Sequence, residues 1–306
     1  MNERALLFGD SDNLVGILTE PDPDKASEDR PGVIFLNSGI LHRAGASRLY
    51  VKIARRLGSS GFTALRFDHS GIGDSEARRD DRSFLESSIH EARLAMDLLQ
   101  ERRGVRQFIL MGLCSGSDMA YWTALVDERV VGLTQLDPFV YRTRKFMVRH
   151  YLPRLLSPRA WWASLRARAR HLSTRLRSAP DDEAARSGWV DPEYTRIFPP
   201  RAEVEQGLGR LAERGVGFYT FISGNMSDLL NYSGQYEESF PSVEFRDLLT
   251  VDFKPQANHT VTGLEHQEMV VAGIDAWARK RWPAGPAAPP PESSTPTTEH
   301  RVSIEV

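Results

Sequence analysis

The chain has 306 residues and a formal net charge of −2, from 39 Lys and Arg residues against 41 Asp and Glu residues. This length accommodates one large α/β domain with an insertion, and the near-neutral charge gives the whole chain no attraction to nucleic acid. No apolar run is long enough to span a membrane, and residues 1–4 lead into no signal core, so we expect a cytoplasmic protein. A single cysteine, Cys114, excludes an internal disulfide framework.

Short apolar runs bounded by turn residues predict strands along most of the chain. They fall at residues 4–8, 13–20, 32–36, 61–67, 107–111, 130–136, 215–222 and 245–253. Amphipathic spacing predicts helices between many of them. These fall at residues 48–57, 84–101, 202–213 and 264–282.

The sequence around Cys114 reads Gly112-Leu113-Cys114-Ser115-Gly116. It follows a predicted strand and precedes residues 118–126, which have the composition of a helix. A strand, a tight turn flanked by glycines and a helix are the context of a nucleophile elbow. A side chain at either glycine would crowd the turn, which lifts the central side chain into a cleft. The alternative is a buried structural thiol, since free cysteines are commonly core residues, but the flanking glycines favour a nucleophile.

This motif resembles the α/β-hydrolase fold, and the resemblance covers roughly residues 5–282. It implies a mostly parallel central sheet flanked by helices, and a triad in the chain order nucleophile, acid, base. On this chain the implied triad is Cys114, then Asp228 after the strand at 215–222, then His259 after the last strand. Two alternatives remain: Asp228 as a turn or helix-cap residue, and His266, within the closing helix, as the base.

The same resemblance implies an oxyanion hole made of two backbone N–H groups. One belongs to Ser115, the residue after the nucleophile. The other comes from the loop after the strand at 32–36, where Gly39 and Ile40 are the candidates. The alternative for that loop is an ordinary connection from strand to helix.

A second glycine-containing loop, at residues 68–75, resembles the Arg-Gly-x-Gly-x-Ser loop of many α/β-hydrolases, with Ser70 in the place of the arginine. The glycines allow a sharp turn beside the active site. In the family this loop is structural, so His69 and Asp74 are not assigned to the triad.

The predicted domain organisation is a hydrolase core interrupted by an insertion. Residues 1–138 and 201–282 form the two parts of the core, residues 139–200 form a helical lid, and residues 283–306 form a disordered Pro-rich tail. Between residues 141 and 180 the insertion is strongly basic and contains no Asp or Glu. Its basic residues are Arg142, Arg144, Lys145, Arg149, Arg154, Arg159, Arg166, Arg168, Arg170, Arg175 and Arg177.

Three interpretations compete for this basic insertion. It is a solvated lid whose arginines pair with acids elsewhere, a docking surface for an acidic partner or a phosphate-bearing substrate, or an interfacial membrane contact through Trp161 and Trp162. The lack of local acids favours an external anion. The candidate anion-binding residues are Arg142, Arg144, Lys145 and Arg149.

A thiol in the place of the usual hydroxyl favours acyl transfer over ordinary ester hydrolysis. A thiolate that attacks a thioester replaces one thioester by another, so the acyl-enzyme stays reactive toward an amine, a hydroxyl or another thiol. Cysteine-elbow members of the superfamily include dienelactone hydrolases, bile-acid acyltransferases and trans-acting aminoacyl transferases that serve carrier proteins. Residues 43–45 and 65–75 also resemble bacterial hydrolases of exosortase-associated and biosynthetic gene clusters.

We therefore predict an acyltransferase or thioesterase that acts on an acyl group carried by coenzyme A or phosphopantetheine. The expected partners are that acyl thioester and an acidic acyl carrier protein, with a homodimer as the candidate oligomer. No metal, cofactor or nucleic acid is expected. The alternatives are a small ester or lactone hydrolase of the dienelactone type, and a catalytically silent scaffold that binds a ligand or partner.

Overall fold

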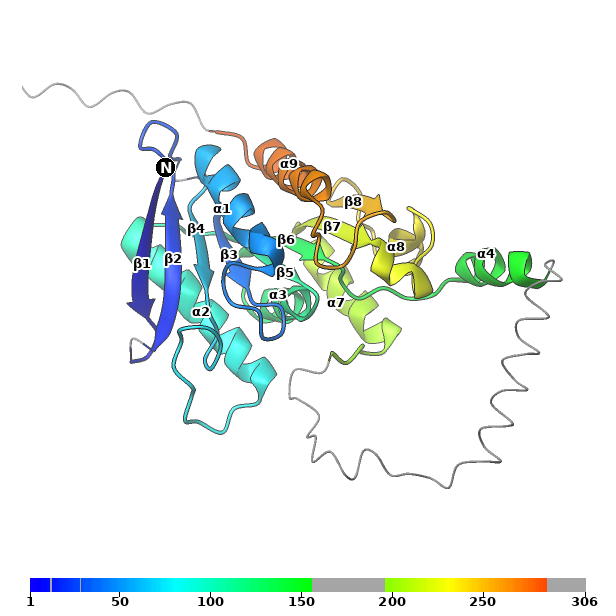
Figure 1. Cartoon of the computed structure of the whole chain (residues 1–306), viewed down its shortest axis with the longest axis horizontal. Helices are drawn as coiled ribbons and strands as arrows, with labels where there is room; N and C mark the ends of the chain where they lie inside the picture. The colour runs from blue at the N-terminus through cyan, green and yellow to red at the C-terminus, as the bar shows by residue number, and fades with distance from the viewer. Residues whose placement is uncertain (12, 28, 156–195, 285–306) are drawn as a thin grey trace, which may run out of the picture.

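The computed structural model describes residues 1–11, 13–27, 29–155 and 196–284, and one eight-stranded sheet forms its centre (Figure 1). The strands lie in the order β1-β2-β4-β3-β5-β6-β7-β8. The first two pairings, β1 with β2 and β2 with β4, are antiparallel, and all later neighbours are parallel. The strands are β1 (Asn2–Phe8), β2 (Leu14–Glu20), β3 (Gly32–Leu36), β4 (Ala64–Phe67), β5 (Phe108–Leu113), β6 (Val130–Leu136), β7 (Gly217–Ser223) and β8 (Leu249–Lys254).

Helices cover both faces of this sheet. On one face, α1 (Leu49–Ser59) and α9 (Leu264–Arg281) bury an apolar cluster against the central strands. On the other, α2 (Phe84–Arg103), α3 (Ser115–Val126) and α7 (Arg201–Glu213) bury a second cluster. The shorter elements are η1 (Ala46–Arg48), α4 (Arg144–Leu155), η2 (Gly224–Asp228) and α8 (Gln235–Glu238).

The predicted α/β-hydrolase fold, with its mostly parallel sheet between two helical layers, is confirmed. Central strands such as β3 and β5 are buried at every residue, which is why they read as continuous apolar runs. Two strand predictions began three or more residues too early. The strand predicted at residues 61–67 begins at Ala64. The last strand begins at Leu249 rather than at residue 245, because backbone hydrogen bonds such as Leu248 N–H to the Phe245 carbonyl (2.8 Å) turn the preceding segment.

The carboxyl ends of β3 and β5 are joined by a side chain from α1. The Tyr50 hydroxyl donates to the Leu36 carbonyl at 3.1 Å and accepts from the Leu113 N–H at 2.8 Å. The backbone ladder between the two strands runs to the pair Leu36 and Gly112. At this point in the strand order the helices switch faces, and in open α/β sheets the crevice outside such a switch point is where ligands bind.

The predicted insertion falls largely outside the described residues. Its first helix, α4, is described, and its start is tied to the core by the Thr143 hydroxyl on the Tyr232 hydroxyl at 2.7 Å. Residues 156–195 and 285–306 are not described, nor is the side chain of Arg154. The predictions for the following residues therefore lie outside what the structure describes: Arg159, Trp161, Trp162, Arg166, Arg168, Arg170, Arg175 and Arg177. Among the described helices, none is both long and apolar enough to cross a bilayer.

Candidate active site

Cys114 lies at the tip of the turn between β5 and α3, in a strained backbone conformation with φ 56° and ψ −120°. Non-glycine residues rarely adopt positive φ, and such strain clusters at functional sites. The glycines on either side are required by close packing. A Cβ on Gly112 would lie 2.0 Å from the carbonyl carbon of Gly116, and one on Gly116 would lie 2.5 Å from the Asn37 carbonyl oxygen. The turn therefore presents the Cys114 side chain at the helix N-terminus.

Replacing Gly116 by alanine is expected to destabilise the protein by about 3 kcal/mol or to prevent soluble folding, because backbone atoms cannot yield to the added methyl group. The measurement is the free energy of unfolding in denaturant. Gly209→Ala in α7 is the matched control, since a Cβ there meets nothing within 4 Å, and helix propensity predicts a gain of about 1 kcal/mol. Equal stability of both variants would contradict the packing assigned to the elbow.

His259 reaches the site from the loop after β8 and is held by a buried carboxylate. Its Nδ1 lies 2.5 Å from Oδ2 of Asp137, which is fully buried at the end of β6. Asp137 also accepts hydrogen bonds from the Ser223 N–H and hydroxyl, both at 2.7 Å. The His259 N–H donates to the Asn225 side-chain oxygen at 2.9 Å. These contacts fix the ring with Nδ1 toward the acid and leave Nε2 for Cys114.

The prediction that Asp228 holds His259 is corrected by this geometry: within the part of the chain that the structure describes, the carboxylate on His259 is that of Asp137. Asp228 is exposed at the end of η2, and its carbonyl accepts from Arg142 Nε at 2.8 Å. Strands β6 and β7 are parallel neighbours, so the loops after both reach the same edge of the sheet. His266, the alternative base, lies in the first turn of α9.

The protonation states of Cys114 and His259 shift in opposite directions. Burial raises the pKa of the thiol, but the hydrogen bond with His259 and the charge of Arg196 outweigh it, so the pKa of Cys114 is lowered. The hydrogen bonds to Asp137 and then to Cys114 raise the pKa of His259 to about 9, against the opposing effect of burial. The two shifts favour the charged forms of both groups, a thiolate beside an imidazolium.

The candidate oxyanion donors are only partly brought together. Ser115 is the first residue of α3, so its N–H has no carbonyl one turn earlier to bond to. Its hydroxyl accepts a hydrogen bond from the Gly39 N–H at 2.7 Å, which places Gly39 beside the elbow. Ile40 follows on the outer side of the loop, with its side chain 76% exposed. In this arrangement the Gly39 N–H is already hydrogen-bonded to the Ser115 hydroxyl and does not point to an oxyanion.

A charged pair that the sequence reasoning missed lies next to the thiol. Arg196 makes a two-point ion pair with Asp118, through Nε at 2.7 Å and Nη2 at 2.8 Å, and its Nη1 lies 3.9 Å from the Cys114 sulfur. Asp118 is in the first turn of α3. No local signal joins the two residues, which are 78 positions apart.

A pocket of about 280 Å³ opens beside this pair. Its wall is mostly apolar and includes four polar residues, Ser83, Ser115, Asp118 and Arg196. The apolar lining consists of Phe84, Leu85, Met119, Trp122, Phe139 and Ile197. An apolar pocket with a few converging polar groups is the usual form of a small-molecule site.

Side chains of the loop at residues 68–75 bond to residues 37–43, the loop after β3. His69 is buried, with its N–H and Nδ1 both on the Asn37 side-chain oxygen at 2.8 and 2.7 Å. Asp74 pairs with Arg43 Nη2 at 2.5 Å, and Asp68 pairs with the same arginine. Neither His69 nor Asp74 contacts the triad residues in these bonds.

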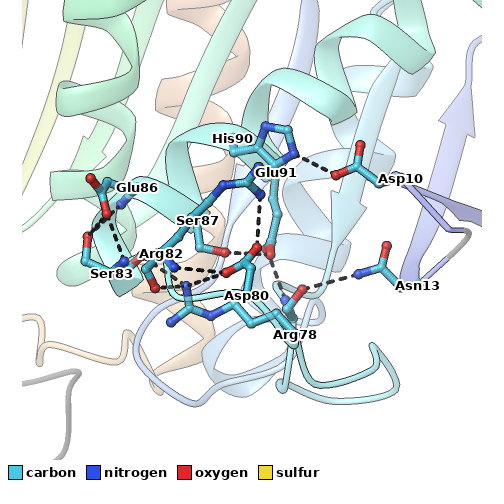
Figure 2. Close-up of polar contacts among 11 residues, drawn as sticks. Asp10, Asn13, Arg78, Asp80, Arg82, Ser83, Glu86, Ser87, His90 and Glu91 are labelled. Carbon is cyan, nitrogen blue, oxygen red and sulfur yellow. Dashed lines mark hydrogen bonds and ion pairs between the residues drawn. The ribbon is translucent and has the colours of Figure 1, made fainter.

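A larger hollow of about 420 Å³ lies between that loop and α2, and its lining carries charged side chains of both signs. Arg82 pairs with Asp80 at 3.0 Å, and His90 lies 2.9 Å from Asp10 (Figure 2). Glu91 accepts from the Ser87 hydroxyl at 2.9 Å (Figure 2). Because acidic and basic groups are mixed in this lining, the hollow does not select a ligand of one charge.

The candidate anion-binding residues lie at the start of the insertion, away from Cys114. Lys145 pairs with Glu238 at 3.1 Å, so for this residue the pairing interpretation is supported. Arg142 and Arg149 lie over the rings of Phe146 and Tyr232 respectively. Arg142, Arg144 and Arg149 are all exposed. Within the described parts of the chain, the ion pair found for these four residues is that of Lys145 with Glu238.

A strained elbow on a mostly parallel sheet, with a histidine and a buried acid from later loops, defines an α/β hydrolase. The family model described as serine aminopeptidase, S33 (Hydrolase_4) matches residues 30–193, more than half of the chain. The chain belongs to this family.

Known proteins resemble the chain in sequence and in structure. The Bacillus subtilis protein named "Putative hydrolase YtaP" is 30% identical over an alignment of 162 residues, and the match covers 44% of this chain and 54% of that protein. The chain thus matches about half the length of this relative.

Among solved structures, the Pyrococcus furiosus esterase Pf2001 superposes with a TM-score of 0.58 at 13% identity, over 92% of this chain and 91% of that one. XC6422 from Xanthomonas campestris, described as a serine hydrolase without a lid, gives 0.55 at 14% identity, over 94% and 98%. At these identities the structural likeness concerns the fold. These three proteins are described as a hydrolase, an esterase and a serine hydrolase.

Proposed function

We propose that this protein is a cysteine-dependent acyl-transfer enzyme, with Cys114 as nucleophile, His259 as acid and base, and Asp137 as the residue that orients the histidine. The observation that carries the proposal is geometric: Cys114 lies at a strained turn between strand and helix, and His259, held by the buried Asp137, hydrogen-bonds to it. The opposed pKa shifts of Cys114 and His259 support a thiolate–imidazolium pair. A pair that is already ionised attacks without prior proton transfer.

The proposed reaction has two steps. The Cys114 sulfur attacks the carbonyl carbon of the donor, the bond to the leaving thiol breaks, and His259 gives that thiol its proton. The acceptor then gives its proton to His259 and attacks the new thioester, and Cys114 leaves as a thiolate. The N–H groups of Ser115 and Gly39 are the proposed donors to the oxyanion in both steps, which requires the Ser115 hydroxyl to release Gly39.

We propose an acyl thioester of coenzyme A or phosphopantetheine as the donor. Two features support this donor class: the apolar pocket beside Cys114, which suits an acyl chain, and the exposed arginines at the start of the insertion, which suit phosphates or an acidic carrier protein. The acceptor is either water, giving a thioesterase, or an amine, hydroxyl or thiol, giving an acyltransferase.

The test is intact-protein mass spectrometry after incubation with a panel of acyl thioesters. We expect an acyl adduct on the wild-type protein, none on Cys114→Ala, and none or a much slower one on His259→Ala. The mass of the adduct identifies the acyl group, and its decay with and without added amine or thiol separates transfer from hydrolysis. The absence of any adduct, together with slow alkylation of Cys114 at neutral pH, would contradict the proposal and favour the silent-scaffold alternative.

The second candidate is a small ester or lactone hydrolase of the dienelactone type. The size and apolar wall of the 280 Å³ pocket favour it, as do the hydrolase and esterase relatives. Turnover of a small uncharged ester at a rate independent of salt, with no turnover of acyl thioesters, would select this alternative.

Reversing the exposed basic residues Arg142, Arg144 and Arg149 to glutamate is expected to raise KM for a coenzyme A or carrier-protein donor about tenfold, with kcat unchanged. The reason is that these charges attract the donor's phosphates or acids and do not touch the reacting atoms. The matched control is the same acyl group on N-acetylcysteamine, which lacks phosphate and should keep its KM. An unchanged KM for both donors would remove the docking role.

A further inference from the structure

The Cys114 sulfur has a second cationic neighbour besides His259. Arg196 lies immediately after the part of the insertion that the structure does not describe, and its Nη1 is 3.9 Å from the sulfur. The guanidinium is largely buried, with a side chain 14% exposed, and Asp118 beneath it is 5% exposed. A buried pair of this kind is not solvated surface charge, so its field at the thiol is only weakly screened.

Asp118, Phe139 and Phe198 orient the side chain of Arg196. The Asp118 carboxylate accepts hydrogen bonds from Nε and Nη2 of Arg196, which leaves Nη1 on the side of the sulfur. The rings of Phe139 and Phe198 lie 5.3 and 4.7 Å from the guanidinium carbon. Two-point carboxylate contacts and aromatic faces are the interactions that position arginine most strictly. The remaining donor therefore has a defined target.

Structural pairing alone does not account for this position. Asp118 by itself raises the pKa of Cys114, whereas Arg196 lowers it by more. Burial raises the pKa of Asp118 to about 6, and the hydrogen bond and charge of Arg196 oppose this rise. A carboxylate at this position disfavours a thiolate at Cys114. Its effect is offset because the same carboxylate holds Arg196, which favours the thiolate more strongly.

We infer that Arg196 is a further catalytic residue of the proposed reaction, a second cation that holds Cys114 as a thiolate, and that Asp118 is the residue that positions it. This inference rests on the proposed nucleophilic role of Cys114. Arg196 then acts both in the acylation of Cys114 and in the transfer of the acyl group to the acceptor. The charge increases the thiolate fraction before attack, and it stabilises Cys114 as the departing thiolate when the acyl group passes to the acceptor, since a thiol of lower pKa leaves faster.

The test is the pH dependence of Cys114 alkylation by iodoacetamide, which needs no acyl substrate. As Cys114 is the single cysteine, the modified mass reports this residue alone. Arg196→Gln is expected to move the alkylation midpoint to higher pH and to slow alkylation at pH 7 about fivefold or more, which is the effect of a unit charge 4 Å away even at the dielectric of water. Arg196→Lys, which keeps the charge, should restore most of the rate.

Two further variants separate the electrostatic role from a structural one. Asp118→Asn keeps the cation and removes the opposing anion, so it should leave the alkylation midpoint at or below that of the wild type. The double variant Asp118→Asn, Arg196→Gln leaves no unpaired charge, and its midpoint should nevertheless lie above that of Asp118→Asn. Thermal unfolding of all variants establishes that they are folded.

A wild-type midpoint in both Arg196→Gln and the double variant would overturn the inference. Failure of the proposed function is a separate result. It would appear as a wild-type protein that forms no acyl adduct with any thioester, whatever the effect of Arg196 on alkylation.

Discussion

Replacement of Asp137 by asparagine is expected to lower kcat by about a thousandfold with little loss of stability. The asparagine keeps the shape of the carboxylate but removes its charge, and it allows the wrong ring nitrogen of His259 to carry the proton. In a serine protease the equivalent change costs about ten-thousandfold. The measurement is single-turnover acylation by a thioester that the wild-type protein accepts, with thermal unfolding to establish the fold.

Asp228→Asn is the matched control for that prediction. It makes the same chemical change on the exposed residue at the end of η2, and its expected kcat is within about twofold of wild type, as for most exposed polar substitutions. A large loss in Asp228→Asn with normal activity in Asp137→Asn would restore the original assignment. Comparable large losses in both would mean that the loop after β7 also shapes the site.

The second large effect is expected from His259→Ala. Loss of the hydrogen bond that lowers the pKa of Cys114 moves the thiol toward its ordinary pKa, where only a few per cent is thiolate at pH 7. Alkylation at pH 7 is therefore expected to fall by about tenfold or more, and turnover to fall further because the leaving group loses its proton donor. The measurements are the alkylation rate and single-turnover acylation.

The sign of the pH dependence follows from the same pair. The lowered pKa of Cys114 keeps the thiolate present at lower pH than in a free thiol, so activity is expected to extend to lower pH than that of a free thiol. The pKa of His259 is raised to about 9, so activity is lost as pH rises through that value and the imidazolium gives up its proton. A profile that rises up to pH 9 and beyond would indicate a neutral histidine acting on a neutral thiol. The apparent pKa values belong to the pair, because the two groups titrate together.

The sequence was most informative where a role imposes local backbone geometry. Gly112 and Gly116 identify the elbow because the turn has no room for side chains at either position. His259 could be found because it follows the last strand. In each case the signal lies within a few residues of the functional group, which is the range over which pattern reasoning works.

Asp137 and Arg196 were missed because their contacts are remote in sequence. The segment Asp137-Pro138 reads as a strand end, which it also is, and nothing near it distinguishes the end of β6 from the end of β7 as the source of the acid. The acid can be assigned to the end of β6 only from the three-dimensional structure, in which β6 and β7 pair in parallel and Ser223 bonds to Asp137. Arg196 meets Asp118 across 78 positions and across a segment with many other arginines.

The hydroxyl of Tyr50 has a consequence for the position of the elbow. It bonds both the Leu36 carbonyl and the Leu113 N–H, so the ends of β3 and β5 are linked through a side chain of α1. From these ends one strand continues into the Gly39 loop and the other into Cys114. Because Tyr50 is almost fully buried, both segments are anchored to a phenol of the core.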